Sequence, residues 1–360
     1  MSDVDQGTTT NTRIVVDDNG EILIDGISFS KERMLSLYNK FLNIYNDGLK
    51  KLKKLGIDLD TVESVSSLGI SKYKVQNDAF YNCFDKNTVY IKKYKKFSTG
   101  NPVLMEKTFK IITDMSSAML LLLHFSSGGT YRLSEICHFH MDNNGTVMKL
   151  YQPDDGKAYL YIVSDYSKKV LIVNDEVTKY FIHFILALYP LRHDAVKDLP
   201  LDSSVNEPSR ILNDVELSFD DDFQGVIESS GLITAKDCLN TFVFTVPRLK
   251  NNEYYASRMV TPILKELLKV DESQSYITIS SLRQALFHYK NETGFKEANN
   301  AFKQFQKIMF SGSDYDERIG LENQVVFANV SNIERTQAFP LLFSVMERLN
   351  QSLGFIEKVN

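Results

Sequence analysis

The sequence contains no tryptophan and only three cysteines, Cys83, Cys137 and Cys238, among its 360 residues. Three widely spaced cysteines form neither a disulfide framework nor a zinc-binding pattern, and they suit a reducing compartment. Glycine (17) and proline (8) are also few, and with 43% hydrophobic and 24% charged residues the composition is that of a folded protein. We therefore exclude a disulfide scaffold and expect no metal or other cofactor.

Long apolar runs are missing as well. The most apolar stretch, residues 115–125, is too short to span a bilayer, and the polar start MSDVDQGTTTNT has no apolar signal core. We expect a nuclear or cytoplasmic protein with no membrane partner. The net charge of −5 does not by itself indicate a nucleic-acid binder, although a local basic patch can still steer binding.

Hydrophobic periodicity predicts a mainly α protein with a small antiparallel β-sheet, an α+β fold. An Asp-Asn-Gly turn indicates a hairpin over 13–26. Three strands, each followed by a turn or a helix, are expected at 146–152, 158–165 and 168–174. The main helices are predicted at 30–56, 103–127, 132–141, 175–189, 253–270, within a strand-turn-helix over 277–294, and over 334–355 with an interruption at Pro340.

Composition divides the chain into a disordered tail (1–12), an N-terminal region (13–100), a larger domain (101–330) and a C-terminal helix (331–360). Residues 85–110 carry seven lysines against two acids. Their focus is YIKKYKKF (90–97), where aromatics alternate with Lys92, Lys93, Lys95 and Lys96. This pattern fits either a solvated face or a linker that tracks a DNA backbone. A second shift, the acidic segment 214–228, indicates an exposed loop or an insertion.

Two arginines stand out because each follows a helix-start signal. Arg132 comes after Gly128-Gly129 and precedes Glu135, and Arg283 comes after ITISS. A helix N-terminus combined with a planar guanidinium suits a phosphate group, which accepts hydrogen bonds from both. The alternative for Arg132 and Glu135 is an ordinary surface ion pair.

Three segments resemble the tyrosine recombinases, also called phage-type integrases. SSGGTYRLSEI is similar to that family's Thr-Gly-Leu-Arg-x-x-Glu box, and the three strands that follow have lysines in the last turn. ITISSLRQALFHYKNETG is similar to the second box, and FQKIMFSGSDY to the segment that ends in the nucleophile. The resemblance spans roughly residues 105–320. It departs from the family at three positions: Ser280 and Gln284 stand where histidine is usual, and Gln306 stands where histidine or tryptophan is usual.

The resemblance implies site-specific cleavage and rejoining of double-stranded DNA through a 3′-phosphotyrosyl intermediate, without metal or nucleotide. Tyr315 would be the nucleophile, and Lys168 or Lys169, with Lys157 as a fallback, would be the general acid. It further implies that Arg132, Ser280, Arg283 and Gln306 would bind the phosphate, that Glu135 would orient Arg132, and that the final helix would dock on a neighbouring protomer of a tetramer.

The departures keep a second hypothesis open: a recombinase-fold protein that binds DNA in an architectural, packaging or regulatory role without cutting it. A third is a helical interaction protein whose motif matches are chance. Frequent Asn, Lys and Ile indicate an AT-rich genome, such as a virus or mobile element.

Overall fold

In the computed structural model, the described part of the chain is mostly helical with two small antiparallel sheets, which confirms the α+β prediction. The elements in chain order are β1 (Ile14–Val16), β2 (Ile22–Ile24), β3 (Ile27–Ser28), α1 (Lys31–Lys54), α2 (Val62–Lys72), η1 (Phe80–Cys83), α3 (Pro102–Ser126), β4 (Thr146–Tyr151), β5 (Tyr159–Ser164), β6 (Lys169–Val173), α5 (Asp175–His183), η3 (Phe184–Leu188), α6 (Tyr189–Val196), α11 (Ile279–Glu292) and α15 (Ala338–Ser352). The structure describes residues 14–16, 21–24, 26–74, 80–84, 102–129, 131–132, 135–136, 139–141, 146–152, 156–164, 169–196, 243–244, 278–293 and 338–357.

The predicted N-terminal hairpin and first helix are confirmed. β1 pairs with β2 in antiparallel register, and β3 adds a third strand. α1 begins where Ser30 accepts the backbone N–H of Arg33 at 3.2 Å, and its last turn is followed by Gly56 in the left-handed region (φ 83°). A side-chain cap and a glycine stop are the signals that delimit a helix in sequence.

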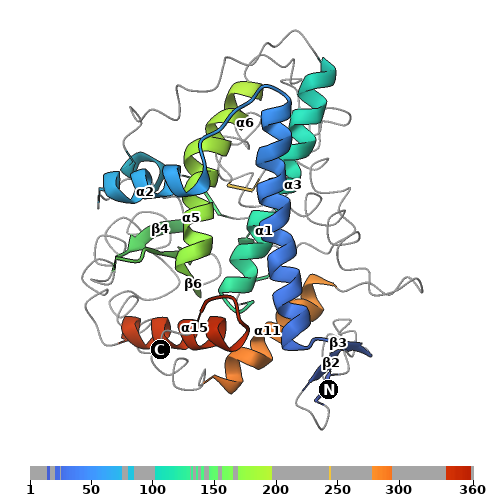
Figure 1. Ribbon diagram of the computed structural model, residues 1–360. Helices are drawn as coiled ribbons and strands as arrows, with labels where there is room; N and C mark the ends of the chain where they lie inside the picture. Colours follow the sequence, from blue (N-terminus) through green and yellow to red (C-terminus); the bar gives the residue numbers. More distant parts are fainter. Residues whose placement is uncertain are drawn as a thin grey trace, which may run out of the picture.

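α1 lies alongside α3, and both belong to one hydrophobic core (Figure 1). The two helices approach closely at Gly48, where an added Cβ would collide with the side chain of Met115. The core runs from Ile22 to Phe355, so it includes elements on both sides of the predicted boundary near residue 100. The tail 1–12 and the basic stretch 90–97 lie outside the described residues.

The second sheet has the strand order β4-β5-β6, as predicted, with Met148 opposite Ile162 and Ile162 opposite Leu171. The helix after it runs further than its expected end at Tyr189. Pro190 lacks a backbone N–H, and the π-helical turn η3 just before it carries the helix on into α6. In that turn the Tyr189 N–H bonds to the Phe184 carbonyl, five residues back.

α11 and α15 pack together at one end of α3, near β2 and β6 (Figure 1). Residues 279–281, expected to form a strand and turn, are helical because Thr278 accepts the Ser281 N–H at 3.0 Å and caps α11. Pro340 does not interrupt α15, since it lies in the first turn, where no backbone N–H is needed. α15 buries Met346 and Leu349 in its own chain's core, and its expected docking on a neighbouring protomer stays a prediction.

No helix in the described part of the chain is both long enough and apolar enough to cross a membrane.

Candidate functional site

The candidate site is built on a double-glycine turn that ends α3. The Gly129 N–H bonds to the His124 carbonyl at 2.9 Å, and the Gly128 N–H bonds to the Phe125 carbonyl at 3.0 Å. These two bonds form a Schellman motif, which requires a left-handed residue after the helix. Both glycines adopt that conformation, with φ of 68° and 64°. The glycines therefore end a buried helix sharply and turn the chain towards Arg132.

Arg132 is exposed although the residue before it is fully buried. Tyr131 packs edge-on against Phe139, with ring centroids 5.2 Å apart, and its hydroxyl lies 3.5 Å from the Ile162 carbonyl. The anchored tyrosine fixes the backbone, so the next side chain points away from the core. The apolar helix before Arg132 thus supports a surface arginine and does not bury it.

Glu135 holds the backbone of Arg132. Its carboxylate is 8% exposed and accepts the Arg132 N–H at 2.5 Å, and the Ile136 N–H bonds to the Arg132 carbonyl at 3.2 Å. This is the glutamate half of a capping box. The Arg132 N–H is therefore occupied by Glu135. The guanidinium is the group of this residue that is left to face an anion.

Arg283 lies directly against the glycine turn. A Cβ added to Gly129 would lie 3.0 Å from the Arg283 carbonyl oxygen and 3.1 Å from its Cα and Cγ, so only glycine fits. Arg283 is half-buried in the second turn of α11, one turn further into the helix than the sequence indicated. The structure thus brings together the two boxes that the sequence analysis singled out.

Arg132 lies close enough to Arg283 for its positive charge to affect the pKa of Arg283. The pKa of Arg283 is lowered, first by burial and then by the positive charge of Arg132, while the negative charge of Glu135 raises it. Two cations and one carboxylate leave the group of three with a positive charge. A bound anion would offset the repulsion between the guanidinium groups, which is the electrostatic setting of a phosphate site.

Ser280 lies one turn before Arg283 on the same side of α11, and Gln284 directly follows Arg283 in the helix. Ser280 is exposed at the position where the resembled family has a histidine. The Gln284 side-chain oxygen is buried, and no hydrogen-bond partner for it occurs among the described residues.

Two further polar residues at this turn were not predicted from the sequence. His124 is 1% exposed on α3, and Lys290 is 7% exposed on α11, where its stem would meet a Cβ on Gly128 at 2.9 Å. Burial lowers the pKa of His124 to about 3, with a further contribution from the charge of Arg283, and burial lowers the pKa of Lys290 to about 7. A polar residue inside an apolar helix was the only signal in the sequence for His124.

The remaining predicted site residues are only partly placed. Lys169 opens β6 opposite Ser164, but its side chain lies outside the described part of the chain. The fallback Lys157 has its Nζ 3.9 Å from the Glu347 carboxylate on α15, and the Tyr159 hydroxyl donates to the same carboxylate at 2.9 Å. Outside the described residues altogether are Lys168, Gln306, Tyr315, Lys92, Lys93, Lys95 and Lys96.

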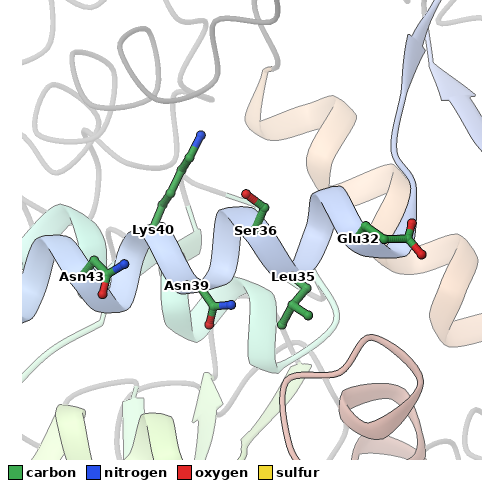
Figure 2. Close-up of a pocket in the computed structure, with 6 residues that line it drawn as sticks. All are labelled: Glu32, Leu35, Ser36, Asn39, Lys40 and Asn43. Carbon is green, nitrogen blue, oxygen red and sulfur yellow. The ribbon is translucent and has the colours of Figure 1, made fainter.

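A separate hollow lies along α1 (Figure 2). Its volume is about 440 Å³, and it includes neither arginine of the site. One acid and one base occur in its lining, which consists of Glu32, Leu35, Ser36, Asn39, Lys40 and Asn43. The hollow therefore lacks the excess positive charge found at the glycine turn. Within the described residues, no group of three or more His, Cys, Asp or Glu side chains is arranged for a metal ion.

Comparison with known proteins adds no relative: no family model, curated protein or solved structure matches this chain. The resemblance to tyrosine recombinases stays a prediction that rests on its motifs and on the meeting of Arg132 and Arg283.

Proposed function

We propose that this chain is a DNA-binding protein of the tyrosine-recombinase type, which cleaves and rejoins double-stranded DNA through a 3′-phosphotyrosyl intermediate. One observation carries the proposal. Arg132 and Arg283, from boxes far apart in the sequence, meet at the Gly128-Gly129 turn, close enough for the charge of one to lower the pKa of the other.

A DNA phosphate is the ligand that this pair fits best. Guanidinium forks bind the two non-bridging oxygens of a phosphodiester with paired hydrogen bonds, and they keep their charge at any physiological pH. Arg132 is exposed for first contact, and the half-buried Arg283 offers a less hydrated cation. The buried Glu135 fixes the Arg132 backbone, which lowers the conformational entropy that Arg132 would lose on binding a phosphate.

In the proposed reaction, the Tyr315 phenolate oxygen attacks phosphorus, the bond from phosphorus to the 5′-oxygen breaks, and a lysine protonates that leaving oxygen. An unassisted phenol has a pKa of about 10, so it depends on nearby positive charge. The two arginines would stabilise the charge that develops on the phosphate oxygens. Lys168 or Lys169 would be the general acid, with Lys157 as the fallback. Ser280 and Gln306 would only donate hydrogen bonds. Religation reverses the steps, and two pairs of protomers would assemble on paired sites.

A second function, DNA binding without cleavage, is favoured by Ser280. A serine hydroxyl is neither a useful base nor a useful acid near neutral pH, and it is exposed where the resembled family has histidine. Loss of one transition-state donor typically costs about 100- to 1000-fold in rate. A protein that only holds the phosphate would serve an architectural, packaging or regulatory role.

Trapping of a covalent adduct tests the proposal. The purified protein is incubated with a pool of nicked suicide duplexes made from genomic fragments, and adducts are resolved in denaturing gels. We expect an adduct with the wild-type chain, none with Tyr315→Phe, and an unchanged yield with the control Tyr151→Phe. Arg132→Ala and Arg283→Ala should each lower the yield at least 100-fold.

Salt dependence of binding separates the two functions. Each arginine that neutralises one phosphate should contribute about one unit to the slope of log Kd against log salt. The exposed Arg348 on α15 provides a matched control for loss of charge. The non-cleaving function would be established if Arg283→Ala lowered the slope by about one unit, Arg348→Ala left it unchanged, and the wild type formed no adduct. Equal slopes for all three proteins would contradict both functions.

A further inference from the structure

His124 occupies the interior side of the arginine-bearing turn. It lies on the last turns of α3 and is 1% exposed, and its carbonyl accepts the Gly129 N–H at 2.9 Å and the Ser127 hydroxyl at 3.1 Å. Its Nε2 atom is buried, and no described residue offers it a hydrogen bond. A buried polar atom without a partner typically costs about 1–3 kcal/mol, so its presence calls for an explanation.

A second buried histidine shows how this chain satisfies an imidazole that has a purely structural role. The Nδ1 of His183 lies 2.9 Å from the Tyr45 hydroxyl, and its Nε2 lies 2.9 Å from the Asp60 carbonyl. Both ring nitrogens therefore have partners, as expected inside a core. The Nε2 of His124 differs in having none, although the side chain is equally buried.

His124 is linked to the candidate-site residue Arg283. Gly129 joins them, since its N–H bonds to the His124 carbonyl and its backbone packs against the backbone and side-chain stem of Arg283. The charge of Arg283 contributes to the low pKa of His124, about 3, so the imidazole is neutral at physiological pH. A neutral imidazole has one nitrogen that accepts a hydrogen bond, and the Arg283 side chain carries only hydrogen-bond donors.

We propose that His124 is a positioning residue for Arg283: its unpartnered Nε2 accepts an N–H of the Arg283 guanidinium when that guanidinium binds a DNA phosphate. The inference rests on the proposed function, because it assigns a partner to the arginine of that phosphate site. His124 does not touch the DNA. It fixes the plane of the guanidinium, so that both remaining edges of the fork face the phosphate oxygens. The Nε2 atom of His124 is then a pre-formed acceptor that receives its hydrogen bond only in the complex with DNA.

A double-mutant cycle on DNA binding tests this role. Binding of a fluorescein-labelled duplex of mixed sequence is measured by anisotropy for the wild type, His124→Leu, Arg283→Ala and the double variant. We expect His124→Leu to weaken binding about tenfold in the wild-type background, the size of one hydrogen bond to a charged group. In the Arg283→Ala background the same change should alter Kd by less than about twofold, because its partner is gone.

Two additional measurements separate positioning from simple packing. His124→Gln places an amide near the former Nε2 and should recover most of the lost affinity. The melting temperature of His124→Leu should equal or exceed that of the wild type, since leucine removes an unpartnered polar atom from the core. A structural role would instead lower the melting temperature and weaken binding equally in both backgrounds, which overturns the inference.

Failure of the inference can be told from failure of the proposed function. If Arg283→Ala weakens binding and His124→Leu does not, the phosphate site stands and the role of His124 is refuted. If Arg283→Ala binds DNA with the same affinity and the same salt slope as the wild type, the phosphate site itself is refuted, and the role of His124 with it.

Discussion

At the residue scale, Lys290 is a cation held in the interior beside the functional turn. Its side chain is 7% exposed, and its Nζ lies 3.5 Å from the Ser127 carbonyl at the end of α3. That distance is long for a hydrogen bond, so the contact offsets little of the cost of removing an ammonium from water. Burial accordingly lowers its pKa to about 7. Lys290 therefore changes its charge within the physiological pH range.

This lowered pKa predicts how stability depends on pH. The folded chain releases the Lys290 proton near pH 7, whereas the unfolded chain holds it up to its ordinary value of 10.5. Between these two values the unfolded state binds more protons, so the contribution of Lys290 to stability rises with pH, by a few kcal/mol in total. The destabilising effect of the buried charge is full below pH 7 and is gone above 10.5.

Lys290→Met removes this dependence because it keeps an unbranched side chain without charge. We expect the variant to be more stable than the wild type at pH 6, and its advantage to shrink steadily towards pH 10. Urea unfolding across this pH range measures the difference, and Lys54→Met, at an exposed position on α1, controls for loss of a lysine. A stability difference that stays constant with pH would contradict the lowered pKa.

The candidate-site residues also show how much could be predicted from the sequence alone. Arg132 and Arg283 were predicted as a pair because both lie in recognisable boxes, and the structure brings them together. His124 and Lys290 were missed because their roles depend on which helix packs against them. α3 is buried on all sides near its end, so periodicity cannot show which neighbour a polar residue will face.

At the element scale, Asn350 ties α15 to two other helices. Its Nδ2 donates to the Ser126 carbonyl at 3.0 Å, next to the glycine turn, and to the Met346 carbonyl at 2.6 Å. Its Oδ1 accepts from Asn174 at 2.9 Å, and Asn174 in turn caps α5 by accepting the Val177 N–H at 2.8 Å. One buried amide thus joins the C-terminus of α3, the N-terminus of α5 and the face of α15.

Asn350→Leu should therefore destabilise the fold by about 3 kcal/mol, because it leaves the Ser126 carbonyl and the Asn174 amide buried without this partner. Chemical denaturation followed by far-UV circular dichroism gives the value. Arg348→Leu, on an exposed position of the same helix, should change stability by less than about 0.5 kcal/mol. Similar losses for the two variants would show that α15 is held by its apolar residues alone.

Local signals located most of the elements, and packing decided the exceptions. Ser30 caps α1 through its own hydroxyl, as the sequence predicted, whereas the cap that Thr278 provides for α11 was mistaken for part of a strand. The end of the helix at Tyr189 was predicted too early, because a π-helical turn precedes Pro190 and the helix continues past it. The packing of α15 on its own chain was not foreseen, because an apolar helix face does not identify its partner.

At the scale of the whole molecule, the N-terminal helices share one core with the elements that carry the arginines. The Tyr38 hydroxyl donates to Glu176 at 2.9 Å, its ring stacks on Phe355 with centroids 4.3 Å apart, and Tyr289 on α11 donates to the Phe29 carbonyl at 2.6 Å. These contacts cross the predicted boundary near residue 100. Two domains that move independently about that boundary would have to break them.

We therefore expect the chain to stay together after it is cut at that boundary. A protease site inserted within 90–97 allows cleavage of the folded protein, and gel filtration should then give one peak that contains both fragments and melts in a single transition. Gly48→Ile serves as the matched variant, because its side chain would collide with Met115 and force α1 away from α3. The cut Gly48→Ile protein should separate, whereas the cut wild type should not. Separation of the cut wild type, with each fragment unfolding cooperatively by itself, would instead establish two independent domains.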